Sequence, residues 1–320
     1  MPFSALAISK RHKQNWTLKD VSFQADAGEI LGIFGPSEAG KSTLIRILGG
    51  LERDHSGRVE LNGAPVVSAS HAFYFSSSIS DKRGWRNLLF GNAAGSPRKA
   101  LRTATEQAMG SDTSVLLFDG PMCGVAPGLV IEEFDRLRDA VRSRQKYLIV
   151  ASANFAEIFE LCDRAVVLID GEAVQTGTPE QIYTDPVSSA VAKLTGRINV
   201  FEARRLSSSK VEVPEFQTIQ GGHRLLIGKT DRSRLGPLNQ NSILAIRPEH
   251  ISISFGASFP EDNLLRAVIV GVRFLGPSTR VELDAGGLRI EALVMRLVGL
   301  KPGDECMLGM PPDRISIFTR

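Results

Sequence analysis

A glycine-containing loop near the N-terminus is the segment whose residue types and spacing point most directly to chemistry. Residues 35–42 read Gly-Pro-Ser-Glu-Ala-Gly-Lys-Ser and fit the phosphate-loop pattern G-x-x-x-x-G-K-[ST] in full. In such loops, backbone N–H groups surround phosphate oxygens, the lysine reaches the outer phosphates and the hydroxyl binds Mg²⁺. The pattern favours an ATP and Mg²⁺ site over a glycine-rich turn without a ligand. The predicted contributors are Gly35, Pro36, Ser37, Glu38, Ala39, Gly40, Lys41, Ser42 and Thr43, with Ser42 as a metal ligand.

The elements on either side support this interpretation. A short apolar run at residues 29–34 predicts a strand before the loop, and helical spacing at 42–48 predicts a helix after it. Further on, apolar runs alternate with amphipathic segments, which indicates an α/β fold with a mostly parallel sheet covered on both faces. The runs predicted as strands are 115–118, 147–151 and 165–169, and the predicted helices are 129–144 and 155–162.

The pattern changes after about Gly196. Short alternating segments separated by Gly, Pro, Asp and Asn follow, without a clear helix, and they predict a small all-β barrel or sandwich. We therefore expect two domains, residues 1–196 and 197–320. The predicted strands of the second are 224–227, 242–246, 251–254, 265–274, 279–283, 288–294 and 315–318.

Several segments together resemble the nucleotide-binding subunits of ABC transporters, most closely those of sugar, polyamine and iron importers. In the second domain, residues 244–251 read Leu-Ala-Ile-Arg-Pro-Glu-His-Ile, which is similar to the oligonucleotide-fold-like regulatory domain of that subfamily. The resemblance implies a phosphate-loop ATPase fold followed by a β barrel-like domain. It also implies ABC membrane subunits and a second nucleotide-binding subunit as partners. The segments of the first domain that carry it are 18–23, 28–29, 35–43, 56–63, 87–91, 162–168, 170–171, 177–183 and 185–186.

The catalytic part of the family pattern is altered. Residues 115–119 match the second nucleotide motif, so the resemblance gives Asp119 the role of holding Mg²⁺ through water; a turn-capping role is the alternative. At the next position, where the family has its catalytic Glu, this chain has Gly120, which carries no group to polarise water. The switch histidine corresponds to Ala153, and the Asp that communicates across the family dimer corresponds to Ala126.

Three other family features are missing or changed. No Gln occurs near Tyr74–Ser76, where the flexible-loop glutamine is expected, and no Leu-Ser-Gly-Gly-Gln type signature occurs anywhere. Residues 93–113 are too few to build the family's full helical subdomain, so we expect a truncated one. Glu38 replaces a common loop glycine. His12 takes the place of the aromatic residue that stacks on adenine, with Trp16 four residues later; a solvated loop is the alternative for His12.

The amino-acid composition excludes several other classes of protein. The 320 residues are 42% hydrophobic and 23% charged, which excludes a largely disordered chain. The 38 basic and 35 acidic side chains form no basic patch in the sequence, so we expect no nucleic acid partner. Three scattered cysteines and the lack of a long apolar run predict a cytoplasmic protein without a disulfide framework. The resemblance to ABC transporter subunits implies a peripheral position at the inner face of the cell membrane.

These observations leave three hypotheses. The first is an active importer ATPase that energises uptake of a sugar or similar solute. The second is an ATP-binding subunit whose hydrolysis is impaired, and the third is a non-catalytic regulatory or scaffold module. The simultaneous absence of the catalytic Glu, the histidine, the glutamine and the signature favours the second, because phosphoryl transfer depends on several positioned groups.

Overall fold

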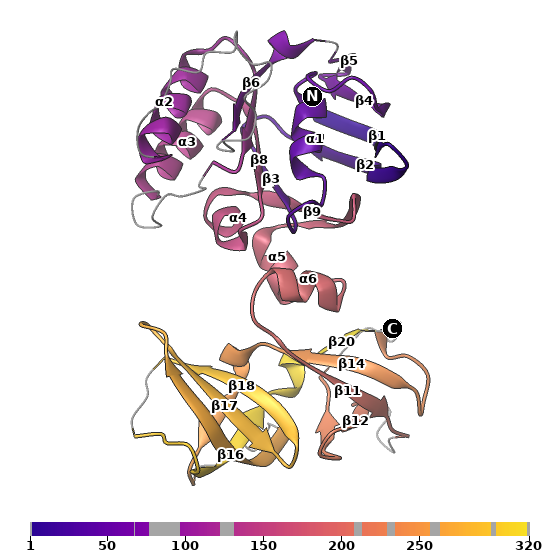
Figure 1. The fold of residues 1–320 in the computed structure, drawn as a ribbon, viewed down its shortest axis with the longest axis vertical. Coiled ribbons are helices and arrows are strands. Elements are labelled where there is room, and N and C mark those ends of the chain that lie inside the picture. The colour runs from indigo at the N-terminus through magenta and orange to yellow at the C-terminus, as the bar shows by residue number, and fades with distance from the viewer. Residues whose placement is uncertain are drawn as a thin grey trace. The chain divides into compact units, whose positions relative to one another are not determined.

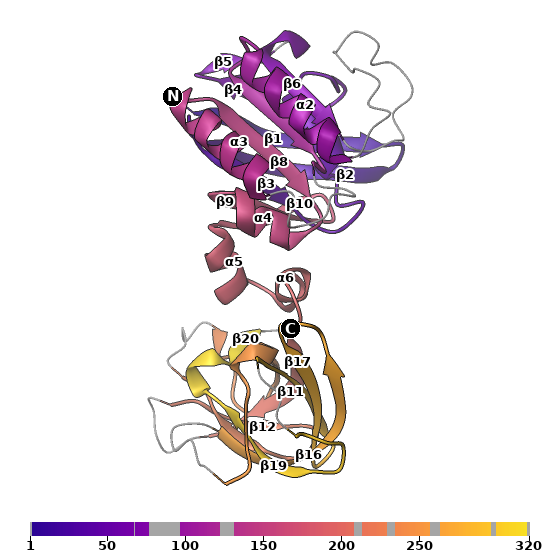
Figure 2. The same cartoon turned by 90° about the vertical axis from the view of Figure 1, so that its left-hand side faces the viewer.

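The computed structural model describes residues 2–66, 68–76, 97–121, 131–207, 213–228, 234–256, 263–295 and 299–318. Contacts divide the chain into two compact units, Met1–Pro186 and Val187–Arg320, which are taken separately below (Figures 1 and 2). The division by contacts falls ten residues before the predicted boundary at 196/197. As a boundary between functional domains, 196/197 stays a prediction.

A six-stranded sheet forms the centre of the first unit, in the order β10-β9-β3-β8-β7-β6. Neighbours from β9 to β6 run parallel, and β10 is antiparallel at one edge, so the expected mostly parallel sheet is confirmed. The bounds are β3 Ile30–Phe34, β6 Ala72–Ser76, β7 Val115–Asp119, β8 Tyr147–Ser152, β9 Arg164–Ile169 and β10 Glu172–Gly177.

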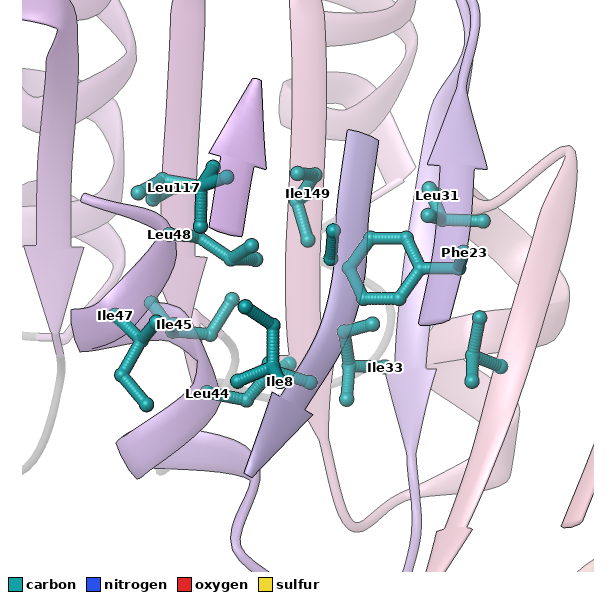
Figure 3. Close-up of a cluster of buried hydrophobic side chains, with 14 of the residues drawn as sticks. Ile8, Phe23, Leu31, Ile33, Leu44, Ile45, Ile47, Leu48, Leu117 and Ile149 are labelled. Carbon is teal, nitrogen blue, oxygen red and sulfur yellow. The ribbon is translucent and has the colours of Figure 1, made fainter. Parts of the chain in front are cut away.

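A second, antiparallel sheet of the first unit has the order β2-β1-β4-β5. Helix α1 (Lys41–Leu48) lies between the two sheets and buries Leu44, Ile45, Ile47 and Leu48 in their shared core (Figure 3). This apolar side of α1 fixes the helix, and therefore the loop before it. The strand bounds are β1 Phe3–His12, β2 Asn15–Ala25, β4 Ser56–Leu61 and β5 Ala64–Pro65.

Helices α2 (Pro97–Gly110), α3 (Ile131–Ser143) and α4 (Phe155–Leu161) lie on the side of the parallel sheet away from α1 (Figure 1). A buried lysine fixes the C-terminal end of α2: Lys146 Nζ donates to the carbonyl oxygens of Ala108, Ser111 and Thr113 at 3.3, 2.7 and 2.8 Å. Helix α2 occupies most of the span predicted to hold a truncated helical subdomain, and it was not predicted from the sequence pattern. The unit ends with α5 (Pro179–Thr184).

The second unit begins with a short helix, α6 (Ser189–Leu194), and in the part that the structure describes it continues with strands and the 3-10 turns Pro248–His250 and Pro312–Arg314. Two five-stranded antiparallel sheets, β13-β12-β11-β14-β20 and β15-β19-β16-β17-β18, enclose one hydrophobic core, as the expected β barrel-like domain requires. The bounds are β11 Asn199–Arg205, β12 Glu215–Thr218, β13 Arg224–Leu226, β14 Asn241–Ile246, β15 Ser252–Ser254, β16 Asn263–Phe274, β17 Thr279–Ala285, β18 Leu288–Val294, β19 Glu305–Met310 and β20 Ser316–Phe318.

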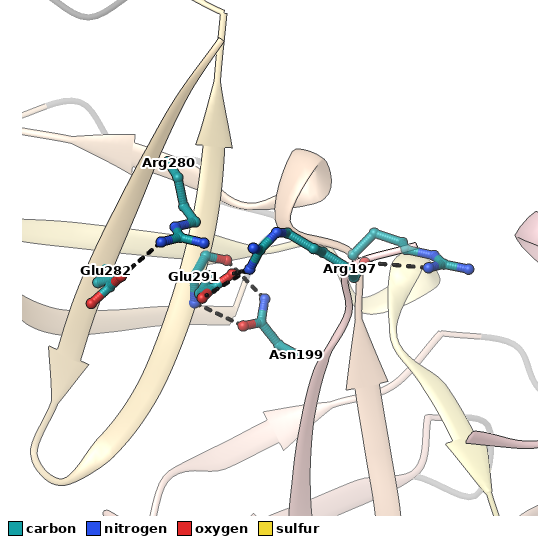
Figure 4. Close-up of polar contacts among 6 residues, drawn as sticks. Arg197, Asn199, Arg280, Glu282 and Glu291 are labelled. Atoms are coloured by element: carbon teal, nitrogen blue, oxygen red, sulfur yellow. Dashed lines mark hydrogen bonds and ion pairs between the residues drawn. The ribbon is translucent and has the colours of Figure 1, made fainter. Parts of the chain in front are cut away.

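Two buried asparagines join these sheets through backbone groups. Asn199 of β11 accepts from the N–H of Glu291 at 2.7 Å and donates to its carbonyl at 2.8 Å, so it pairs with the edge of β18 (Figure 4). Asn263 of β16 makes the same pair of bonds with Leu226 of β13, at 2.6 and 2.9 Å. Each amide thus satisfies edge groups that would otherwise be left unpaired.

Helix α6 is tied to the second unit by Arg247. This side chain is 5% exposed and donates to the carbonyls of Ala192 and Arg197 and to the Thr195 hydroxyl, at 3.0, 3.2 and 2.6 Å. Carbonyls at a helix C-terminus lack partners within the helix, and a cation is favourable there. The segment around residues 192–197 is therefore held to the β sheets.

Arg247→Met is expected to lower the free energy of unfolding by about 2–4 kcal/mol, because it leaves buried carbonyls without donors. Limited proteolysis should then cut within residues 194–198, a segment that the wild-type protein protects. In the wild type we expect cutting within 184–188, where Thr184, Asp185 and Val187 are exposed. Arg204→Met, an exposed arginine of β11, is the control and should leave both readouts unchanged. Equal protection of 194–198 in Arg247→Met would contradict the assigned role.

Candidate nucleotide site

The predicted phosphate loop joins the end of β3, a central strand of the parallel sheet, to the start of α1. Gly40 is the N-cap residue of α1, with φ of 97° and no side chain to cap the helix. The first N–H groups of an α-helix have no partner within the helix, and they attract anions. The loop therefore presents backbone donors to a phosphate group at the carboxyl edge of the sheet.

The loop is fixed by close approach to two other strands. A Cβ on Gly35 would lie 2.1 Å from the carbonyl oxygen of Leu168 in β9, and a Cβ on Gly40 would lie 2.6 Å from that of Thr17 in β2. Neither position can hold a side chain without a shift of backbone. Glycine at both points is thus a steric requirement of this turn as well as a feature of the motif.

Lys41 lies back over the loop that precedes it. Its Nζ donates to the carbonyl oxygens of Gly35 and Pro36 at 2.9 and 2.6 Å. Burial lowers the pKa of Lys41, and the negative charge of Asp119 acts in the opposite direction. The ammonium group is therefore at the loop, near one carboxylate, where it can bind the outer phosphates of a nucleotide.

The other loop residues differ in exposure. Ala39 is buried and donates its N–H to the carbonyl of Pro36 at 3.3 Å, while Ser37, Glu38 and Ser42 are exposed. Glu38 has φ of 68°, in the left-handed region, which costs a residue with a side chain roughly 1–2 kcal/mol. This conformation explains why a glycine suits this position, and Thr43 follows in the half-buried first turn of α1.

Asp119 is buried at the end of β7, with Ser76 of β6 and Ala151 of β8 opposite it in register. A hydroxyl, a carboxylate and phosphate oxygens are the kind of oxygen donors that Mg²⁺ accepts. Ser42 and Asp119 fit that requirement by chemistry. No group of three or more His, Cys, Asp and Glu side chains placed for a metal ion occurs among the described residues.

The structure describes two of the positions at which this chain departs from the family's catalytic pattern, Gly120 and Ala153. Gly120 has φ of 60°, and its N–H donates to the carbonyl of Ala151 at 2.8 Å. Ala153 follows β8 with an exposed methyl group. Neither offers a base or a hydrogen-bonding side chain to water. Ala126, residues 93–96 and the segment 87–91 lie outside the described residues.

Sequence reasoning missed a polar cluster beneath the loop. Burial and the charge of Asp119 raise the pKa of the Tyr74 phenol, and hydrogen bonds with Ser76 and Arg46 act against that rise. Arg46 belongs to α1, and both Tyr74 and Ser76 belong to β6. Ser76 stands where the family glutamine is expected. Its position at the end of a parallel strand was therefore the sequence signal that could have indicated a site residue.

A second missed group lies at the end of β8. The Ser152 hydroxyl donates to Glu157 Oε2 at 2.6 Å and accepts from the N–H of Asn154 at 2.9 Å. Burial raises the pKa of Glu157, and hydrogen bonds from Ser152 and Asn154 oppose the rise. This cluster fixes the start of α4, directly after the position of the missing histidine.

His12, the predicted adenine contact, is exposed at the end of β1, opposite Asn15. Trp16 precedes Thr17, the residue whose carbonyl approaches Gly40. The Arg11 guanidinium covers one face of the Trp16 ring, 3.9 Å from its centroid, and the side chain is 45% exposed. By its place in the chain, Trp16 is therefore closer to the loop than His12.

Comparisons with known proteins agree with this architecture. The ABC transporter family matches residues 18–121, and the TOBE domain family matches residues 244–318. The chain is similar to the Fe(3+) ions import ATP-binding protein FbpC of Photorhabdus laumondii, at 23% identity over 98% of this chain and 95% of that protein. It is also similar to the maltose/maltodextrin import ATP-binding protein MalK of the same organism, at 26% identity over 97% and 94%. A crystal structure of an ATP-binding cassette of an ABC transporter in its ADP conformation has a TM-score of 0.52 and 15% identity, covering 61% of this chain and 98% of that one.

A phosphate loop on a parallel sheet, followed by a β barrel-like unit, defines a nucleotide-binding subunit with an appended β domain. The two family matches and the relatives together support an importer-type nucleotide-binding subunit of the ABC transporter family with a C-terminal TOBE domain. No helix among the described residues is both long and apolar enough to cross a bilayer.

Glu157→Gln is expected to change how stability depends on pH. Because the pKa of Glu157 is raised in the folded state, its contribution is fully present below the ordinary glutamate pKa of about 4.3 and is lost as pH rises through the folded value. Glutamine can still accept from Ser152 and does not titrate. The melting temperature of the variant relative to wild type should therefore increase as pH rises above about 4.3. Glu160→Gln, exposed on the same helix, is the control, and parallel pH curves for Glu157→Gln and wild type would contradict the inference.

Proposed function

We propose that this chain is the ATP-binding subunit of an ABC-type solute importer that binds MgATP but hydrolyses it poorly. The observation that carries the proposal is the contrast within one site. The loop glycines, Lys41, Ser42 and Asp119 are in place, whereas Gly120 and Ala153 stand where the family has its catalytic Glu and histidine.

The intact part accounts for nucleotide binding. The N-terminus of α1 would hold phosphate oxygens, Lys41 would exchange its loop carbonyls for the outer phosphates, and Ser42 and Asp119 would hold Mg²⁺. When bound, Mg²⁺ neutralises charge on the phosphates. The exposed carboxylate of Glu38 adds some repulsion, which solvent screens.

The altered part accounts for poor hydrolysis. An attacking water must be oriented by a positioned base or hydrogen-bonding group, and the rate depends on several such groups acting together. Gly120 contributes only a backbone N–H, which already bonds to Ala151. The left-handed φ of Gly120 adds a second obstacle, because a glutamate there would be strained by roughly 1–2 kcal/mol.

The relatives suggest the setting in which this subunit works. Their names describe import ATP-binding proteins, among them proteins for Fe(3+) ions and maltose/maltodextrin. We therefore propose ABC membrane subunits and another nucleotide-binding subunit, identical or different, as partners. The corresponding location is cytoplasmic, peripheral at the inner face of the cell membrane. The near-complete coverage of these relatives also supports the competing hypothesis of an active ATPase, which the phosphate-release experiment below decides.

Nucleotide binding should be visible as thermal stabilisation. A ligand that binds only the folded state stabilises it by about 2.7 kcal/mol at roughly 100 times its dissociation constant. Millimolar MgATP should raise the melting temperature of the wild type by a few degrees, and Lys41→Ala should abolish the shift. Lys99→Ala, an exposed lysine of α2, should behave as wild type. An unchanged wild-type melting temperature would sink the binding proposal.

Hydrolysis should remain at background. Phosphate release from MgATP by wild-type protein is expected to equal that of Lys41→Ala, and Gly120→Glu alone should not raise it, since missing transition-state groups are non-additive. Thermal shift with MgATP on the same samples verifies that each protein still binds. Wild-type turnover clearly above Lys41→Ala would return the chain to the active ATPases.

The nucleobase contact can be assigned by substitution. Base stacking on an aromatic ring contributes about 1–3 kcal/mol, so Trp16→Ala should weaken MgATP binding roughly 5- to 150-fold. His12→Ala should change it little, because His12 lies at the far end of the hairpin. Titration of both variants gives the comparison. A larger loss of MgATP affinity in His12→Ala than in Trp16→Ala would instead assign the adenine contact to His12.

A further inference from the structure

An open pocket of about 460 Å³ lies on the TOBE-containing unit, within a single sheet and its adjoining turns. Its base is formed by neighbouring strands β19, β16 and β17, and the segment that follows β15 forms one wall. The residues used below are Phe255, Arg266, Val268, Asp284, Glu305 and Met307. The pocket lies in the second unit, whereas the nucleotide site belongs to the first.

Strand register places these side chains on the outer face of the sheet. Along β16, Leu265, Ala267 and Ile269 enter the core, so Arg266 and Val268 point outward. Met307 pairs with Arg266, and Val268 lies between Glu305 on one side and Asp284 on the other. Residues directly opposite each other share a face, so one cation and two carboxylates surround the outward-facing Val268.

Two of these charges have no partner within the part of the chain that the structure describes. Within the described residues, neither Arg266 nor Glu305 takes part in a hydrogen bond or an ion pair through its side chain, although both line the same pocket. Asp284 differs, because it accepts from the N–H of Gly287 at 2.7 Å and pairs with Arg289 at 3.1 Å. Elsewhere on the same unit, Arg197 pairs with Glu291 at 3.0 Å and Arg280 with Glu282 at 3.4 Å (Figure 4).

The same pocket exposes apolar surface. Phe255 is 59% exposed and Val268 is 38% exposed, and Met307 belongs to β19, which lies between β15 and β16. Covering such surface removes apolar area from water and is therefore favourable. A matching ligand therefore has an apolar part as well as two opposite charges.

We propose that this pocket binds a small apolar zwitterion of the α-amino acid class. Its carboxylate would accept from the Arg266 guanidinium, and its ammonium group would donate to Glu305. Its side chain would lie against Phe255 and Val268. A molecule with only one of the charges would leave either Arg266 or Glu305 unmatched and would lose one charge-assisted hydrogen bond.

The test is calorimetric titration of the full chain with L-leucine. We expect a dissociation constant of about 1 mM, given the small size of the ligand. Two analogues separate the charges: 4-methylpentanoate lacks the ammonium group, and 3-methylbutylamine lacks the carboxylate. Each should bind about tenfold more weakly than leucine, since each loses one charged hydrogen bond.

Variants then assign the contacts. Arg266→Met and Glu305→Gln should each weaken leucine binding about tenfold. Arg266→Met should leave the affinity for 3-methylbutylamine unchanged, and Glu305→Gln should leave that for 4-methylpentanoate unchanged. Arg273→Met, exposed on the same strand and outside the pocket lining, is the matched control and should bind leucine as wild type does.

Three results would overturn the proposal. The first is the absence of binding heat at a leucine concentration about ten times the expected dissociation constant. The second is equal affinity for leucine and for both analogues. The third is wild-type affinity for leucine in Arg266→Met and Glu305→Gln. Thermal unfolding of each variant, which should match the wild type because both substituted side chains are exposed, verifies that loss of binding is not loss of folding.

Discussion

The turn from β3 into α1 is the constraint on which the nucleotide-binding unit depends. The chain leaves a buried parallel strand and enters a helix while its backbone lies against β9 and β2, with room for no side chain at Gly35 or Gly40. The apolar side of α1 then fixes the helix between two sheets. Backbone donors can face a phosphate only because packing on both sides holds this turn in place.

Part of this architecture could be predicted from local pattern. The strands at 115–119 and 147–152 are continuous apolar runs, and the helix over 131–143 has regular amphipathic spacing, so local residues suffice. Helix α2 and strand β6 have weaker patterns: the buried side of α2 consists mostly of small residues such as Ala104 and Ala108, and β6 is one short apolar run. Their stability comes from distant groups: Lys146 bonds the C-terminal end of α2, and β6 is paired along its length with β7. Contacts of that kind are invisible in a local window.

The residues of the candidate site likewise fall into those that could be predicted from the sequence and those that were missed. The loop and Asp119 could be found because motif spacing lies within one strand-to-helix or strand-to-turn segment. Tyr74 and Ser76 were missed, because they meet Asp119 only through the register of β6 on β7. Ser152 and Glu157 were missed since a serine after a strand and a glutamate in a helix are ordinary singly, and only the 2.6 Å bond makes them a unit.

The pattern of retained and altered groups bears on function. Three buried side chains that shape the second unit form hydrogen bonds: Arg247 bonds the end of α6, and Asn199 and Asn263 join the β sheets. In the first unit, Gly120 has a left-handed φ and an N–H bonded across to β8. A glutamate at position 120 would have to adopt this left-handed conformation, as Glu38 does in the phosphate loop, or the backbone there would have to shift. This backbone arrangement supports the proposal of a subunit that binds nucleotide and hydrolyses it poorly.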